Sequence, residues 1–422
     1  MSFSHNRLSR NAPVNAAVIV LLVMGLVGCT APADTSPIRL GILHSLTGPQ
    51  AFNERRLVDA ELLAVEEINA AGGLLGRQVE AVTGNGQSNA DTFAEVTERL
   101  IADDHVSAVV GGGTSSDRKT VLPVIEWYDS LLLYPLAYEG LEQSSNVIYT
   151  GSTPNQQTLP AVRWFLENRG TRFFLVGSDD VWARSQNAII KDTLEDLGGT
   201  VVGEEYLPLH QQDTSAIAKR ISDAEPDVIV NALNHALVGF FLNLASAGID
   251  PHNTSIFSLA VGEDTVRTLR TDEIVGSYAV WPYFQSLGTE ENQEFTTRFK
   301  ERNGNHRRTD DQINNAYVAV RLWAQAVTSA GTDNPAVVAE AARRQSLDAP
   351  EGRIWVDEVN GHVWRSPRIG QVQSDGQFDI VWTSETTVRP EPYPASRTKS
   401  EWEEFQQALH RQWGRNWFLP PS

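Results

Sequence analysis

A regular alternation of strand-like and helix-like segments is the feature that most constrains how this chain can fold. Apolar runs typical of buried strands occur at Ile38–Leu43, Gln78–Thr83 and Val106–Val110. Between them, apolar residues recur at helical spacing from Val58 to Ile68 and again from Phe93 to Leu100. This β-α-β-α-β order predicts a parallel sheet with right-handed crossovers and helices on its faces.

A second alternating series follows the first. Helices are predicted over Leu159–Asn168 and Trp182–Leu197, with a strand at Arg172–Val176 between them. Further strand-like runs occur at Val201–Tyr206, Asp227–Asn231, Ser255–Leu259 and Gly276–Val280. The pattern then becomes helical over Phe295–Arg302, Ile313–Ala330 and Pro335–Arg344, and β-like over Gly352–Trp382. Because 422 residues exceed what one core usually holds, the chain is expected to form two α/β lobes.

The N-terminus has the pattern of a bacterial lipoprotein signal. Arg7 and Arg10 precede the uncharged apolar run Ala16–Gly28, which is too short to span a bilayer. The run ends in Leu-Val-Gly before Cys29, the only cysteine of the chain. We therefore predict a cleaved signal at residues 1–28, a lipid on Cys29 and a flexible tether over residues 29–37. The protein would then be exported and lipid-anchored, in the periplasm or on the outer face of the cell membrane; the alternative is an ordinary signal with an incidental cysteine.

Composition and motifs argue against several functions. The net charge of −19 argues against nucleic-acid binding, which needs basic clusters. The nine histidines show no metal-ligand spacing, and neither a GxSxG elbow nor a GK[ST] phosphate loop occurs. We therefore expect no catalytic site, no metal and no cofactor, although paired carboxylates cannot be judged from sequence.

Half of a binding cleft is predicted within Gly111–Gly140. The strand at Val106–Val110 runs into a Gly-Gly-Gly-Thr-Ser-Ser turn, and a helix follows from near Asp117. A second run, Leu131–Tyr134, ends in Pro-Leu-Ala-Tyr. Ligands of open α/β sheets bind outside the carboxyl ends of strands, where glycines permit close backbone approach. The simpler alternative is a βα turn that only caps a helix.

The tail at residues 389–422 differs from the rest in character. Three alternating prolines after Arg389 predict a stiff connector, and Ser400 with Glu403 has the spacing of a capping box. One face of the predicted helix carries Trp402, Phe405, Leu409 and Trp413. The helix could dock on a partner or a membrane; packing against the body of the protein is the simpler interpretation.

Several short stretches together carry a family resemblance. They are Leu43–Gly48, Ala60–Gly76, Arg118–Pro123, Tyr138–Leu141, Asn146–Gln157, Phe174–Asp179, Gly198–Leu209 and Ile369–Trp382. On these stretches the chain, from Ile38 to Pro394, resembles the type I periplasmic binding proteins and, among them, the urea and short-chain amide binding proteins of ABC transporters. The resemblance implies two α/β lobes joined by three hinge crossovers, which close on a ligand like a flytrap. It assigns residues 38–156 and 286–348 to one lobe and 157–285 and 349–388 to the other.

The resemblance also implies which residues contact the ligand. They are Gly113, Thr114, Ser115, Tyr134, Leu136, Ala137, Tyr138, Asp180, Trp182, Asn234 and Glu263. Hydroxyls could donate to an amide carbonyl, and Asp180, Glu263 and Asn234 could accept from its N–H groups. Urea and amide binders usually have an aromatic residue at Gly113, a tyrosine at Asp180, a polar residue or proline at Ala137 and a smaller aromatic at Trp182. These departures would give a larger and more acidic pocket, which could suit an amine-bearing ligand.

The implied function is capture of urea or a short-chain amide and delivery to ABC permease subunits. Three alternatives stay open at this point: the same fold with specificity for an amino acid or amine, a sensor that passes ligand information to a membrane protein, and an amide hydrolase using Asp180 and Glu263.

Overall fold

The first lobe is built on a five-stranded parallel sheet. The computed structural model describes residues 35–269 and 271–420. Its first sheet has the order β2-β1-β3-β4-β5, and every neighbouring pair is parallel. The strands are β1 (Ile38–His44), β2 (Val79–Asn85), β3 (Ala108–Gly111), β4 (Leu132–Tyr134) and β5 (Val147–Tyr149). The helices between them are α1 (Ala51–Ala70), α2 (Ala90–Ala102) and α3 (Ser115–Trp127). The predicted β-α-β-α-β order is confirmed.

The second lobe contains a seven-stranded mixed sheet in the order β15-β14-β10-β9-β8-β6-β7. Its parallel strands are β6 (Arg172–Ser178), β7 (Thr200–Leu207), β8 (Val228–Ala232), β9 (Ser255–Ser258) and β10 (Tyr278–Trp281). The antiparallel strands β14 (Arg368–Val372) and β15 (Phe378–Thr383) extend one edge. The helices are α4 (Thr158–Asn168), α5 (Val181–Leu197), α6 (Ser215–Ala224), α7 (Leu237–Ser246), α8 (Glu263–Val266) and α9 (Thr271–Ile274), and the 3₁₀ turn η1 (Pro154–Gln156) precedes α4.

The chain returns to the first lobe after β10. Here it forms α10 (Glu290–Asn303), α11 (Asp311–Ala330), α12 (Pro335–Ala342) and a small antiparallel sheet of β11 (Ser346–Ala349), β12 (Gly352–Val356) and β13 (Val363–Trp364). The side chains of Leu347, Ile354 and Val363 pack in the same core as β1 and α1. The predicted division between residues 348 and 349 differs from this packing, because the small sheet covers the first lobe and the chain re-enters the second lobe only at β14.

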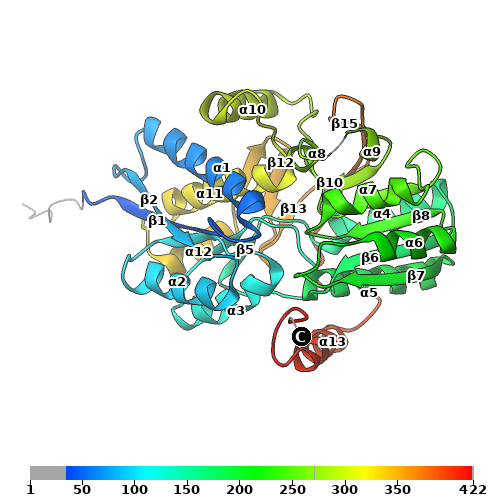
Figure 1. The fold of residues 1–422 in the computed structure, drawn as a ribbon. Coiled ribbons are helices and arrows are strands. Elements are labelled where there is room, and N and C mark those ends of the chain that lie inside the picture. The colour runs from blue at the N-terminus through cyan, green and yellow to red at the C-terminus, as the bar shows by residue number, and fades with distance from the viewer. Residues whose placement is uncertain (1–34, 270, 421–422) are drawn as a thin grey trace, which may run out of the picture. The chain divides into compact units, whose positions relative to one another are not determined.

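Three crossings therefore join the lobes, as the fold class predicted. The chain passes between them after β5, after β10 and after β13 (Figure 1). Each lobe has its own apolar core, formed by strands that are buried on both faces. Near-continuous apolar runs are typical of such strands in parallel sheets, which is why the sequence pattern located them. Both lobes and the tail belong to one compact unit, Ser36–Ser422.

The tail forms a helix that packs on the body of the protein. Helix α13 (Lys399–Gln412) buries Trp402 completely. The predicted capping box at Ser400 and Glu403 is wrong: the cap is Thr398, whose N–H and Oγ1 both donate to Glu401 at 2.7 Å. The same spacing two residues earlier satisfies the free N–H groups of the first turn, so the helix begins at Lys399. Packing against the body, the simpler of the two sequence interpretations, is confirmed.

The predicted signal peptide and Cys29 lie outside the described residues. Residues 35–37, the end of the predicted tether, lead directly into β1. A search of the described part of the chain finds no helix with the length and apolar character needed to cross a bilayer.

Candidate solute-binding cleft

A cavity of about 80 Å³ lies between the two lobes, at the ends of their parallel strands. The first lobe lines it from the start of α1 with Gln50, Asn53, Glu54, Arg56 and Leu57, and from β3, α3 and β4 with Thr114, Ser115, Tyr134, Leu136 and Ala137. The second lobe adds Asp180, Trp182, Asn234, Leu237, Leu259, Ala260 and Thr265. Gln312, at the start of α11, also lines it. Such a space holds a molecule of few heavy atoms.

The structure thus brings eight of the eleven predicted contact residues to one cavity. They are Thr114, Ser115, Tyr134, Leu136, Ala137, Asp180, Trp182 and Asn234. Three predicted residues do not line it: Gly113, Tyr138 and Glu263. Each of these three has a structural environment of its own.

Gly113 shapes the turn that leads into α3. Its φ is +68°, and a Cβ there would stand 2.6 Å from Asp117 Oδ2 and 2.7 Å from Phe93 Cζ. No larger residue fits without moving these neighbours, so the aromatic residue expected of urea binders has no room here. Thr114 follows as the N-cap of α3, and its N–H and Oγ1 donate to Asp117 Oδ2 at 2.9 and 2.8 Å.

The hydroxyl of Ser115 already donates its hydrogen bond to a neighbouring residue of the protein. Its Oγ donates to Glu139 Oε2 at 2.5 Å and accepts from Arg118 Nη1 at 3.2 Å. Arg118 is fully buried and also bonds Glu139 and Glu142. Ser115 was predicted as a ligand donor, but only an oxygen lone pair remains for a ligand in this arrangement.

The two predicted tyrosines play different parts. The Tyr134 ring lines the cavity, and its buried hydroxyl has no hydrogen-bond partner within the protein. Tyr138 stacks on Tyr149 with ring centroids 5.2 Å apart, and its hydroxyl meets His362 Nε2. Burial raises the pKa of both Tyr134 and Tyr138, so both hydroxyls keep their protons at neutral pH. Tyr134 can therefore donate to a ligand, while Tyr138 does not line the cavity and its hydroxyl is bonded to His362.

Asp180 is the carboxylate that the second lobe presents to the cavity. It caps α5, where Oδ1 accepts from the N–H of Ala183 and Oδ2 from Asn234 Nδ2, both at 2.8 Å. Burial raises its pKa to about 7, helped by the charges of Glu139 and Asp179, although these two hydrogen bonds act in the opposite direction. No Lys or Arg side chain hydrogen-bonds to Asp180 in the described chain.

Glu54 is a site residue that sequence reasoning missed. It is 3% exposed, and its Oε1 has no hydrogen-bond partner, while Oε2 accepts from the N–H of Ser45 at 2.6 Å. His44 lies behind it, with Nδ1 3.5 Å from Glu54 Oε2 and Nε2 2.9 Å from Glu61 Oε1. Burial alone would lower the pKa of His44, but Glu61 and Glu54 raise it to about 10. The imidazolium of His44 thus lies directly behind Glu54, which lines the cavity.

Arg56 is the one arginine among the described residues that line the cavity, and its guanidinium already has partners within the protein. Arg56 is ion-paired with Asp310, and its Nη2 donates to Gln312 at 2.9 Å. Glu263 lies behind this wall at the start of α8, where Oε1 accepts from the N–H of Gln285 at 2.6 Å. Burial raises the pKa of Glu263 well above its usual range, with Asp310 nearby adding to the effect. Burial therefore favours the protonated form of Glu263, and because this residue does not line the cavity it is not the ligand acceptor that the sequence predicted.

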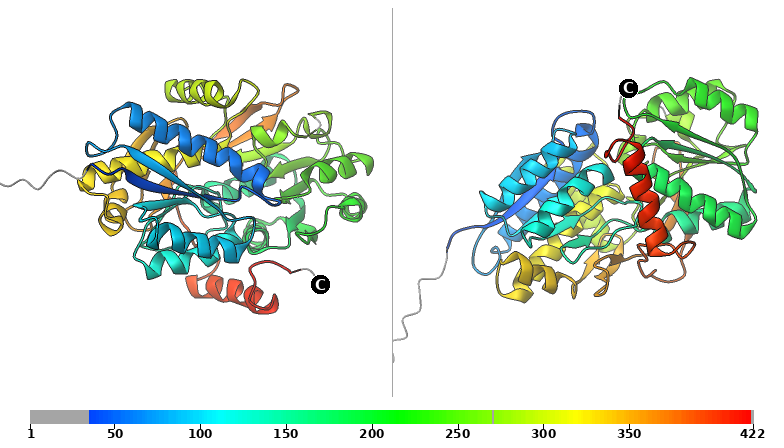
Figure 2. Two further views of the ribbon diagram at one scale, coloured as in Figure 1. Left: turned by 60° about the vertical axis from the view of Figure 1, so that its left-hand side comes forward. Right: turned by 90° about the horizontal axis from the view of Figure 1, so that it is seen from below.

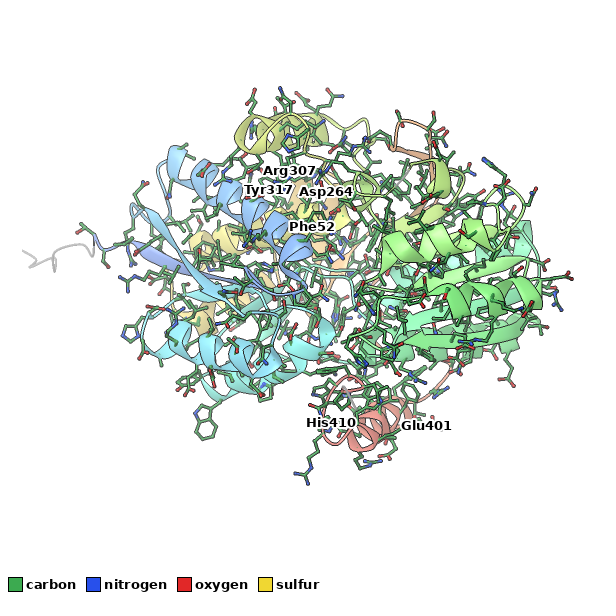
Figure 3. The ribbon with its side chains drawn as sticks, in the orientation of Figure 1. Phe52, Asp264, Arg307, Tyr317, Glu401 and His410 are labelled. Carbon is green, nitrogen blue, oxygen red and sulfur yellow. The ribbon has the colours of Figure 1, made fainter. Side chains whose placement is uncertain are left out.

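An outer chamber of about 590 Å³ adjoins the cavity and shares Gln50, Asn53, Thr114, Asp180 and Asn234 with it. Phe52, at the start of α1, and the tail residues Asn416, Phe418 and Leu419 line this chamber. Figure 3 labels Phe52 at the end of α1 that approaches the second lobe. Asp117 also lines it; burial raises the pKa of Asp117 to about 7, and the charges of Glu54 and Asp180 contribute.

The site therefore offers hydrogen-bond acceptors more than donors. Glu54, Asp117 and Asp180 are each at least 94% buried, and no lysine lines either space. Among the described residues that line the cavity, Trp182 Nε1 and the Tyr134 hydroxyl are the buried side-chain donors without a hydrogen-bond partner in the protein. Within residues 35–269 and 271–420, no three His, Cys, Asp or Glu side chains converge as metal ligands would. This arrangement suits a small molecule with several N–H groups, flanked by the Trp182 and Tyr134 rings.

Two α/β lobes with three crossings and a cavity between them define a two-lobed solute-binding protein. The chain belongs to the family described as periplasmic binding protein domain, whose model matches residues 38–399. It is accordingly a substrate-binding protein of the ABC-transporter type rather than an enzyme.

Curated relatives and solved structures agree with this family. A leucine-, isoleucine-, valine-, threonine- and alanine-binding protein of Pseudomonas aeruginosa is 26% identical over 344 residues, which cover 80% of this chain and 90% of the relative. Leu/Ile/Val-binding protein homolog 7 of Brucella melitensis is 21% identical over 397 residues, which cover 88% of this chain and 97% of the relative. A solute-binding protein of Rhodopseudomonas palustris, solved with 3,4-dihydroxybenzoic acid, shares the fold with a TM-score of 0.77 at 19% identity. The match covers 84% of this chain and 99% of that protein. These matches support the family but not the urea and amide subfamily.

Proposed function

We propose that this protein captures a small solute rich in N–H donors between its lobes and delivers it to the permease of an ABC importer. The observation that carries the proposal is Glu54, which is buried in the cavity wall with one oxygen unpartnered. A buried carboxylate oxygen without a partner is costly, and a ligand N–H group placed there would remove that cost. A lipid on Cys29 would hold the protein at the membrane during transfer.

Two ligand classes meet this description. Urea and short-chain amides present neutral N–H groups and a carbonyl that the Trp182 N–H or the Tyr134 hydroxyl could bind. Amines and amino acids present an ammonium group, for which Glu54 and Asp180 on facing lobes are suitable partners. Neither carboxylate hydrogen-bonds to a Lys or Arg side chain in the described chain, and the nearby His44 is shared with Glu61, which favours the ammonium class. The names of the Pseudomonas and Brucella relatives are compatible with an amino acid ligand.

A thermal-shift screen tests the proposal. The panel would contain urea, formamide, acetamide, neutral and basic amino acids, and polyamines. A solute that binds only the folded state raises the melting temperature by mass action. A shift with any of these supports capture of an N–H-rich solute, and its size across the panel separates amides from amines. The absence of a shift with every compound would contradict the proposed ligand chemistry.

Variants of the cavity wall test whether the thermal shift arises from binding at the cleft. Asp180→Asn and Glu54→Gln alter the cavity wall, while Asp223→Asn alters an exposed carboxylate paired with Lys219 on α6. The first two should reduce the thermal shift produced by the solute, and the third should leave it unchanged. Equal shifts in all three variants would mean that the solute binds elsewhere.

A further inference from the structure

The C-terminal tail contacts both lobes, and its helix lies beyond the matched family region. The family match ends at residue 399, where α13 begins. Figure 2 shows α13 lying along the seam between the first lobe, in blue and cyan, and the second lobe, in green. Glu401 and His410 mark its two ends in Figure 3. Residues 399–419 are called the strap below.

Gln406 joins the lobes from the middle of the strap. It is 3% exposed, and its Nε2 donates to Glu139 Oε1 of the first lobe at 3.4 Å and to Ser185 Oγ of the second lobe at 3.3 Å. Its Oε1 accepts from Lys119 Nζ at 3.0 Å. The same Glu139 accepts the hydroxyl proton of Ser115, so this bridge is one residue removed from the cavity wall.

A second bridge lies at the carbonyl of Trp417. This oxygen accepts from Ser116 Oγ of the first lobe at 3.1 Å and from the N–H of Val181 of the second lobe at 2.9 Å. The N–H of Leu419 also donates to the carbonyl of Asp179 at 2.8 Å. Val181 and Asp179, the two residues of the second lobe in these bonds, lie on either side of Asp180 in the sequence. The strap therefore ends beside the carboxylate that lines the cavity.

Apolar packing reinforces both bridges. The side chain of Trp402 packs with Leu141 of the first lobe and with Ala188 and Ile189 of the second. Trp413 and Leu409 pack on Val181 at the start of α5. Burial of these apolar and aromatic side chains adds to the hydrogen bonds in holding the strap on both lobes.

We propose that the strap clasps the two lobes beside the cleft and limits how far they open. If the lobes swing apart about their three crossings, the donors Ser116 and Val181 move apart and the carbonyl of Trp417 cannot keep both. The Gln406 bridge between Glu139 and Ser185 is subject to the same constraint. Since Phe418 and Leu419 line the outer chamber, the strap also narrows the route to the cavity.

The separation of the lobes can be measured without knowing the solute. Single-molecule energy transfer would use dyes on Glu95→Cys, exposed on α2, and Ala216→Cys, exposed on α6, with Cys29 replaced by serine. Two variants loosen the strap: deletion of residues 416–422, and Gln406→Ala. The control is Gln407→Ala, whose side chain is exposed one residue further along. Circular dichroism would establish that each variant is folded.

The proposal predicts a population at longer dye separation in the deletion and in Gln406→Ala, but not in Gln407→Ala. Amide exchange at Val181 should also become about tenfold faster in the deletion, as expected when one hydrogen bond is lost. If the deletion variant does not fold, Gln406→Ala decides the question. Dye separations equal to wild type in the folded variants would overturn the proposal and leave the tail with a role in stability only.

Discussion

At the residue scale, the cleft depends on carboxylates whose charge is set by burial. Asp180 and Asp117 both have pKa values near 7, so both are partly protonated in the empty protein at neutral pH. An incoming cation would favour the ionised form of Asp180 and Asp117, which couples solute binding to proton release.

Replacing Asp180 should separate the two ligand classes. Asp180→Asn removes a charge but keeps an oxygen that can accept the N–H of Ala183. We expect about tenfold weaker binding or more for an amine-bearing solute, because charge-assisted hydrogen bonds contribute about 1.5–3 kcal/mol. A neutral amide should lose much less. Calorimetric titration of wild type and variant measures this difference, and an unchanged amine affinity would remove Asp180 from the site.

The affinity for an amine-bearing solute should also depend on pH. The pKa of Asp180 is raised to about 7, so its carboxylate form is complete above about pH 8 and is lost as the pH falls below 7. Affinity should therefore be constant above pH 8 and decrease by up to about tenfold per pH unit below 7. Titrations between pH 5.5 and 8.5 would show this, with a shallower slope in Asp180→Asn. Affinity that rises on acidification would contradict the assignment.

The His44 cluster predicts how stability itself changes with pH. The pKa of His44 is raised to about 10, so its contribution is complete below its unfolded value near 6.5 and is lost as the pH rises through 10. The free energy of unfolding should fall by about 1 kcal/mol per pH unit between pH 7.5 and 9.5. Guanidinium chloride is the suitable denaturant, since urea is a candidate solute. In His44→Gln the slope should largely disappear; an identical slope would assign it to other groups.

At the element scale, the start of α3 shows why one glycine is required. Gly113 combines a positive φ with close contacts to Asp117 and Phe93. Gly113→Ala should lower the free energy of unfolding by about 2–3 kcal/mol, since a strained backbone and a forced contact add. Gly248→Ala is the matched control, with φ of +83° and no atom within 4 Å of the added Cβ. Equal losses in both variants would mean that the contacts at Gly113 contribute nothing.

The sequence located most elements but not every boundary. Apolar runs predicted β1, β3 and β4 closely, because strands buried on both faces leave an unambiguous pattern. Helix α3 begins at Ser115, two residues before the predicted Asp117, because Thr114 forms the cap. The cap of α13 lies two residues before the predicted one, because two capping-box spacings overlap there, Thr398 with Glu401 and Ser400 with Glu403, and the structure forms the first.

At the scale of the whole molecule, the two lobes and the cavity between them follow from the chain order. The resemblance predicted eight of the residues that line the cavity, and all eight lie at strand ends, in the turns that follow them or in the first turn of a helix. It missed Glu54 and Arg56, which lie within α1, because a helical carboxylate or guanidinium is most often on a solvated face. A possible signal was the histidine at the end of β1, since a buried His44 needs carboxylate partners nearby.

The most direct test of the central claim is hydrogen exchange of the wild-type protein with and without the solute that gives the largest thermal shift. If the solute is held between the lobes, exchange should slow together at the start of α1, at the start of α3 and at the start of α5. These three segments carry Glu54, Ser115 and Asp180. Protection confined to one lobe, or located away from all three segments, would contradict capture between the lobes.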